Sequence, residues 1–230
     1  MPTTWNTEVA VEARAEYVRD ILLAGHGREV VWIDESGFHM SGMRRSRGRA
    51  VAGRKAVLTV IPKSRRLNVL GAISQRGVIL INYVVSTLNR KKNEGGQGGT
   101  NAKDFRSFLL DLAPKLPRGS LLVMDNAKIH HAKLLDDTTW NLLKGQYDLR
   151  KIYLPPYSPF LNPIEFVFNH VKALLKGQEF DSEAHFQRLV KQTFLSIDAD
   201  LAIKFIRHSE DFYEQCQAAI PYDGTILPAE

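Results

Sequence analysis

The sequence carries three acidic residues, Asp34, Asp125 and Glu165, at positions that could together perform phosphoryl transfer. Asp34 follows the apolar run 29–33 and Asp125 follows the run 121–124, and both runs are typical of buried strands. Because ligands collect at strand ends in sheets flanked by helices, these carboxylates can converge there. Clustered carboxylates repel one another, and Mg²⁺ or Mn²⁺ suits such a set of hard oxygen ligands. Two ions about 4 Å apart can activate an attacking water or hydroxyl and stabilise the leaving oxygen.

The elements that must position these acids alternate between strands and helices, which indicates an α/β fold. Apolar runs bounded by turn residues predict strands at 29–33, 56–61, 68–73, 78–85, 121–124 and 151–154. Apolar residues at helical spacing predict helices at 8–23, 102–116, 132–143, 163–176, 182–195 and 201–217. The three strands predicted between 56 and 85 are spaced as an antiparallel meander. Asn162 and Pro163 are expected to be the N-cap and first residue of the helix that carries Glu165.

The charge of the chain favours a polyanionic partner. Its 31 Lys and Arg exceed its 25 Asp and Glu, which gives a formal charge of +6. Nine cations and no carboxylate lie in the stretch 44–66. They are Arg44, Arg45, Arg47, Arg49, Arg54, Lys55, Lys63, Arg65 and Arg66. This run is either a solvated loop face or a surface that contacts DNA phosphates, and we assign DNA contacts to the first six and to Lys172.

The composition is that of an ordinary globular protein, with 44% apolar and 24% charged residues. No apolar stretch is long enough to span a membrane, and the first 30 residues lack a signal-peptide core. The single cysteine, Cys216, excludes an internal disulfide and fits a reducing compartment. We therefore expect an intracellular protein without a membrane partner, in the nucleus of a eukaryote or the cytoplasm of a bacterium.

Three sequence blocks resemble the mariner-type transposase family. The first is Ile-Asp-Glu-Ser-Gly-Phe at 33–38, and the second is Val-Met-Asp-Asn-Ala-Lys-Ile-His at 123–130. The third, Leu-Pro-Pro-Tyr-Ser-Pro-Phe-Leu-Asn-Pro-Ile-Glu at 154–165, is the most specific, because so long a proline-rich pattern rarely arises by chance. The resemblance covers roughly residues 30–177.

The resemblance implies a ribonuclease-H-like fold, with a mixed five-stranded sheet flanked by helices. It also implies that Asp34, Asp125 and Glu165 are the catalytic residues and the ligands of two Mg²⁺ or Mn²⁺ ions. Thirty-nine residues separate the second acid from the third, which is longer than the commonest mariner-type spacing. This departure leaves the subfamily open, and the extra residues are expected around 136–148.

Domain boundaries are expected near residues 27 and 197. Residues 1–27 would form a linker helix, 28–197 the ribonuclease-H-like catalytic domain, and 198–230 a C-terminal helix and tail. Family members usually carry two N-terminal helix-turn-helix modules, whereas this sequence has one helix before its first catalytic strand. It is therefore expected to be an excised catalytic domain, a truncated product or a domesticated remnant.

Other polar residues near the three acids have alternative roles. Asn126 and His130 could steady a metal-bound water or a scissile phosphate, as the outer partners of metal ligands do. They could equally be a turn-forming Asn and a helix-capping His. Glu35 should point to the opposite side of its strand from Asp34, and we place it outside the triad.

The leading functional hypothesis is a cut-and-paste DNA transposase domain, a nuclease and strand transferase acting on transposon ends and target DNA. It is expected to form a homodimer when assembled on DNA. The alternative is a domesticated DNA-binding protein without catalytic activity, which the intact triad argues against. A glycosidase with paired carboxylates offers no reason for the arginine-rich run.

Overall fold

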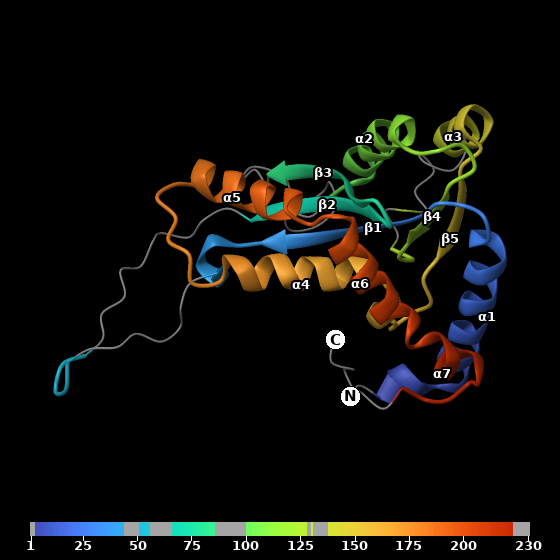
Figure 1. Cartoon of the computed structure of the whole chain (residues 1–230), viewed down its shortest axis with the longest axis horizontal. Helices are drawn as coiled ribbons and strands as arrows, with labels where there is room; N and C mark the ends of the chain where they lie inside the picture. Colours follow the sequence, from blue (N-terminus) through green and yellow to red (C-terminus); the bar gives the residue numbers. More distant parts are fainter. Residues whose placement is uncertain are drawn as a thin grey trace.

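The computed structural model describes residues 3–43, 51–55, 66–85, 100–127, 130 and 138–222 (Figure 1). The strands of this part are β1 (Val30–Phe38), β2 (Leu67–Ser74), β3 (Gly77–Val85), β4 (Leu121–Met124) and β5 (Arg150–Tyr153). Its α-helices are α1 (Glu8–Gly25), α2 (Ala102–Leu112), α3 (Trp140–Tyr147), α4 (Pro163–Leu175), α5 (Glu183–Leu195), α6 (Ala199–Glu210) and α7 (Tyr213–Gln217). The expected strand at 56–61 lies outside the described residues.

The five strands form one mixed sheet in the order β3-β2-β1-β4-β5. β1 pairs antiparallel with β2, and β2 pairs antiparallel with β3, so this half is a meander. β1 pairs in parallel with β4, and β4 with β5. A parallel pair needs a long crossover connection, which the chain supplies with helices, as the alternating pattern predicted.

β1 is longer than the sequence pattern suggested, and Asp34 lies within it rather than at its end. The parallel pairing with β4 does stop at Ile33, opposite Met124. Beyond that point β1 continues to Phe38 because its other edge stays hydrogen-bonded to β2, where Asp34 is opposite Gly71. Asp34 therefore lies beside the end of β4 on a strand that is held from one side.

Helices cover both faces of the sheet (Figure 1). Because successive side chains of a strand point to opposite faces, those of β1 belong alternately to the cores on the two sides. Trp32 and Phe38 belong to the core cluster that includes the buried face of α4. Val31 and Ile33 belong to the second cluster, which is formed with α2. Asp34, two residues after Trp32, therefore shares the face of β1 that α4 covers.

Several helices end elsewhere than the apolar spacing indicated. The predicted helix 102–116 stops at Leu112 and continues as a 3-10 turn, because Pro114 cannot extend the α-helical hydrogen bonds. The predicted helix 201–217 is two helices, α6 and α7, separated at Asp211 and Phe212. Of the predicted helix 132–143, residues 132–137 lie outside the described part, and α3 runs from Trp140 to Tyr147.

The terminal helices pack onto the same core as the sheet. Tyr17 and Val18 of α1 share a hydrophobic cluster with Ile206 of α6 and with β1, and α1 lies beside α7 (Figure 1). Arg14 of α1 is buried, and its Nε donates to Ser158 Oγ at 2.9 Å in the proline-rich turn before α4. The first helix thus braces the turn that delivers Glu165.

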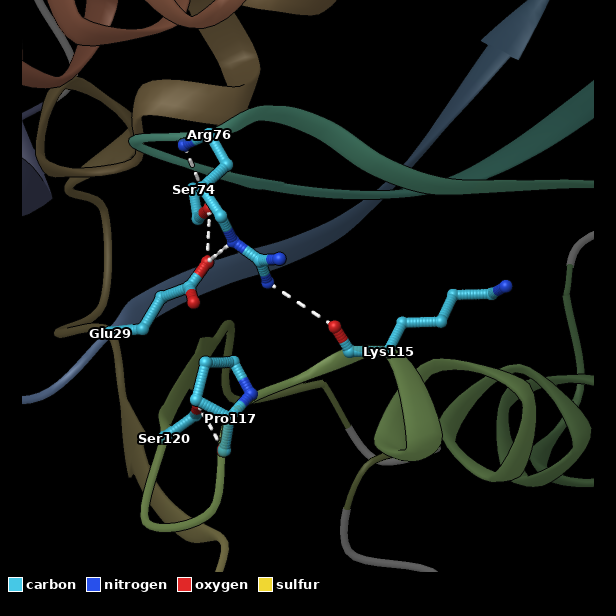
Figure 2. A network of polar contacts seen from close by, with 6 residues as sticks. All are labelled: Glu29, Ser74, Arg76, Lys115, Pro117 and Ser120. Carbon is cyan, nitrogen blue, oxygen red and sulfur yellow. Dashed lines mark hydrogen bonds and ion pairs between the residues drawn. The ribbon is translucent and has the colours of Figure 1, made fainter.

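A polar network fixes the turn between β2 and β3 (Figure 2). Arg76 Nε donates to Glu29 Oε1 at 2.7 Å, and Ser74 Oγ donates to the same oxygen. The Arg76 guanidinium also donates to the backbone oxygen of Lys115. These contacts join the start of β1 to the segment before β4 and so support the register of the sheet. No helix among the described residues is long and apolar enough to cross a membrane.

Candidate active site

The structure brings Asp34, Asp125 and Glu165 into one hollow at the sheet edge where β4 ends. Its volume is about 290 Å³. The other residues that line it are Glu35, Ser36, Arg66, Asn68 and Thr100. Three acids that are far apart in the chain thus share a single polar concavity.

Asp34 is strongly enclosed, with 7% of its surface exposed. The backbone N–H of Glu35 donates to its Oδ1, and Asn162 Nδ2 donates to its Oδ2, both at 2.6 Å. Burial raises the pKa of Asp34 to about 8, and the neighbouring charges of Glu165 and Asp125 contribute to this rise. The anionic form of Asp34 is therefore disfavoured in the metal-free protein.

Asp125 follows β4 and is held by His130. Its Oδ1 accepts from the backbone N–H of Ala127 at 3.1 Å and lies 2.8 Å from His130 Nδ1. The His130 ring is buried against Phe105, with ring centroids 4.2 Å apart. Burial alone lowers the pKa of His130, but hydrogen bonds to Asp125 and its charge raise it above the ordinary value overall. His130 is thus placed to orient the Asp125 carboxylate.

Glu165 and Lys172 come from α4, which begins at Pro163 because its ring fixes a helical φ where no amide donor is needed. Burial raises the pKa of Glu165; Lys172 opposes this shift and Asp125 adds to it. Lys172 Nζ donates to Ser36 Oγ at 2.8 Å and lies 5.3 Å from the centre of the Phe38 ring. The cation is therefore fixed between α4 and β1, beside the acidic hollow.

The residues of the hollow fit a divalent cation in chemistry, although not in their present spacing. No group of three or more His, Cys, Asp or Glu within the described ranges is close enough to hold a metal ion. The carboxylates of Asp34 and Asp125 are instead turned toward hydrogen-bond donors. Glu35 also lines the hollow, and its Oε2 is buried without a hydrogen-bond partner among the described residues. Carboxylate oxygens are the hard donors that a divalent ion prefers. Its charge would offset the repulsion between the carboxylates and let them come closer together.

The predicted DNA contacts are only partly described by the structure. Arg44, Arg45, Arg47 and Arg49 lie outside the described residues. Arg54 and Lys55 are exposed in the segment 51–55, which Figure 1 shows apart from the sheet. Arg66, which was not among the predicted contacts, lines the hollow. Its place directly before β2, at the end of the cationic run, was the available signal.

Asn126 and Glu35 each directly follow an acid of the predicted triad in the sequence. Asn126 is exposed on the surface, and its functional role stays a prediction. Glu35 belongs to the face of β1 opposite Asp34, as alternation predicts, yet it still forms part of the hollow's wall. The reason is that β1 continues beyond the end of β4.

Asn162 was expected only as a helix N-cap, and its contact with Asp34 was not anticipated. It does occupy that position, but its side chain makes no hydrogen bond to the helix. Sequence spacing gives no signal for a side-chain contact across 128 positions.

Comparison with known proteins shows the family of this chain. Residues 29–187 match the family described as DDE superfamily endonuclease, and the chain belongs to it. Its fold is similar to the Mos1 transposase chain in a pre-cleavage transpososome, with a TM-score of 0.73 and 20% identity. That match covers 95% of this chain and 65% of the Mos1 chain, so this chain spans about two thirds of that protein.

Two further Mos1 structures agree in fold. The catalytic domain of Mos1 mariner transposase matches with a TM-score of 0.63 and 18% identity, over 92% of each chain. A Mos1 mariner paired-end complex with Mn matches with a TM-score of 0.71 and 21% identity, over 95% of this chain and 64% of that one. These similarities confirm the predicted ribonuclease-H-like fold with its mixed five-stranded sheet. Comparison with curated protein sequences found no match.

Proposed function

We propose that this chain is the catalytic domain of a cut-and-paste DNA transposase, which cleaves DNA and transfers the resulting 3′ ends. The observation that carries the proposal is the meeting of Asp34, Asp125 and Glu165 in one hollow of a DDE endonuclease domain. Two basic side chains, Arg66 and Lys172, adjoin the same hollow. Such a site can receive a phosphodiester next to an acidic cluster.

In this proposal the three carboxylates hold two Mg²⁺ or Mn²⁺ ions. When bound, the ions would supply activation of a water or 3′ hydroxyl and stabilisation of the leaving oxygen. Mos1 paired-end complexes are described with Mn and with Mg, which supports divalent ions as the choice. The same site would serve hydrolysis at the transposon end and attack on target DNA.

The residues of the chain have distinct tasks in this reaction. Asp34 and Glu165 interact electrostatically from β1 and α4, so their separation is set by the packing of that helix on the sheet. His130 orients the Asp125 carboxylate through its Nδ1. Arg66 and Lys172 add positive charge where the scissile phosphate would approach, and Asn126 would contact it from the surface.

DNA is the proposed partner, and the assembled state is a homodimer on DNA. Support comes from the net charge of +6 and from the Mos1 structures, which are described as a transpososome and a strand transfer complex. Arg44, Arg45, Arg47, Arg49, Arg54, Lys55 and Lys172 are the proposed DNA contacts. Location in the nucleus of a eukaryote, or the cytoplasm of a bacterium, follows from this partner.

A cleavage and joining assay tests the proposal. The purified chain should nick plasmid DNA with Mg²⁺ or Mn²⁺ but not with EDTA, and should join a 3′-hydroxyl duplex end to a plasmid. Asp34→Asn, Asp125→Asn and Glu165→Gln should each reduce both reactions to background while circular dichroism stays unchanged. Asp181→Asn, at a carboxylate with 84% side-chain exposure, is the matched control and should keep activity.

The alternative, a domesticated DNA-binding protein, makes the opposite prediction in the same assay. DNA binding would persist in a gel-shift experiment, whereas the unsubstituted chain would neither nick nor join DNA at any metal concentration. Near wild-type cleavage by any one of the three triad variants would remove that residue from the proposed site.

A further inference from the structure

Asn162 differs from the polar caps of three other helices in this protein. At the N-cap positions of α1, α5 and α6, Thr7, Ser182 and Asp198 each accept a hydrogen bond from the backbone N–H three residues on. This is the usual stabilising role of a polar N-cap. Asn162 is the N-cap of α4 and makes no such bond. Its side chain must therefore be explained by something other than capping.

The side chain of Asn162 is committed to Asp34. It is buried, with 2% of its surface exposed, and its Nδ2 donates to Asp34 Oδ2 at 2.6 Å. Its Oδ1 is buried without a hydrogen-bond partner in the described part of the chain. Leaving a buried acceptor unpaired costs stability, so this orientation of the amide is not the one that local packing alone would favour.

The contact links two elements that carry candidate metal ligands. Asp34 lies on β1, and Asn162 starts α4, whose first turn contains Glu165. Pro163 restricts the backbone between them, so movement of Asn162 is passed directly to the first turn of the helix. A shift of Asp34 toward an ion would therefore be resisted or guided by the amide that holds its Oδ2.

We propose that Asn162 is a positioning residue that sets the geometry of Asp34 relative to Glu165 and thereby the affinity of the site for divalent ions. The inference rests on the proposed function, because it assumes that these two carboxylates bind metal. In this role Asn162 acts through Asp34, to which it donates its hydrogen bond, and not by binding the ion. Loss of an outer partner of a metal ligand commonly weakens metal binding by about 10- to 100-fold.

Asn162→Ser separates this role from capping, because serine is as good an N-cap but is too short to reach Asp34. Titration calorimetry with Mn²⁺ alone should show binding weakened about 10- to 100-fold in a variant that remains folded by circular dichroism. Asp198→Ser changes the cap of α6 and is the matched control, for which Mn²⁺ affinity should not change. Equal Mn²⁺ affinity in Asn162→Ser and the unsubstituted chain overturns the inference.

A double-mutant cycle tests the same inference without metal or activity. Asn162→Ser is made in the unsubstituted chain and in Asp34→Ala, and unfolding is measured in urea with EDTA. If the amide acts through Asp34, the change in the unfolding equilibrium constant of the double variant should differ by about twofold or more from the product of the two single changes. Simple multiplication of the effects would mean that Asn162 does not act through Asp34 and would overturn the inference.

The two failures can be told apart. If the unsubstituted chain binds no Mn²⁺, the proposed function fails whatever the cycle shows. If it binds Mn²⁺ and Asn162→Ser binds it equally well, only the role of Asn162 is refuted.

Discussion

Replacing Asp34 with asparagine should stabilise the metal-free protein, and the gain should depend on pH. Burial and two neighbouring acids raise the pKa of Asp34 from 3.8 to about 8. Between these values the folded state binds a proton that the unfolded chain releases, so the stability of the unsubstituted protein falls as pH rises through this window. Above pH 8 the full cost of the buried anion is present.

The size of the effect follows from the pKa. Each tenfold change in proton affinity is worth about 1.4 kcal/mol, so a rise from 3.8 to about 8 means that the anion costs the fold about 6 kcal/mol at pH 9. A buried amide has its own cost of about 1–3 kcal/mol, which leaves an expected net gain of about 3–5 kcal/mol. The new amide also finds a partner, because Asn162 Oδ1 is unpaired and can accept from it once the Asn162 side chain flips.

Urea unfolding in EDTA, followed by tryptophan fluorescence, measures this gain. Trp32 is buried two residues from Asp34 and reports on the same strand. The difference in unfolding free energy between Asp34→Asn and the unsubstituted protein should be largest at pH 9 and near zero at pH 5. Saturating Mn²⁺ should stabilise only the unsubstituted protein. Equal stabilities at pH 9 would refute the idea that Asp34 is a buried anion awaiting a cation.

Three other perturbations test the surroundings of the site. His130→Ala should weaken Mn²⁺ binding about 10- to 100-fold in calorimetry, because Asp125 loses its orienting partner, and an unchanged affinity would make His130 a core residue only. Arg14→Met removes the bond to Ser158 and should lower DNA nicking by up to about a hundredfold through misplacement of Glu165; full activity in a folded variant would contradict the bracing role. The salt dependence of DNA binding should weaken when alanine replaces Arg44, Arg45, Arg47 and Arg49. The slope of log DNA affinity against log salt should fall by up to about 0.9 for each DNA phosphate that is no longer neutralised. An unchanged slope would mean that this run is a solvated loop face.

The sequence predicted the elements that have strong local signals. α4 begins where Asn162 and Pro163 indicated, since a proline at the first helical position constrains only nearby backbone. β4 is the predicted run 121–124, because it is short, wholly apolar and bounded by turns. Convergence of the three acids could be expected from their positions at the ends of predicted strands and the start of a predicted helix, and from the resemblance to a known family.

Features that depend on distant pairing could not be predicted in this way. β1 continues to Phe38 because β2 satisfies its hydrogen bonds, which the composition of β1 alone does not indicate. α6 and α7 are separated at Asp211 and Phe212, although the apolar spacing of the sequence is unbroken there. Phe212 packs in the core against Phe160, a tertiary contact that the spacing does not reveal. The bond from Asn162 to Asp34 depends on how α4 packs against the sheet, which no local pattern encodes.

We propose that Asp34, Asp125 and Glu165 together form one site for divalent metal ions. Crystals of the protein soaked in Mn²⁺ and measured at the manganese absorption edge test it most directly. We expect an anomalous peak within coordination distance of all three carboxylates, and loss of that peak in Asp34→Asn. Absence of a peak between these carboxylates at millimolar Mn²⁺, or a peak bound only elsewhere on the protein, would contradict it.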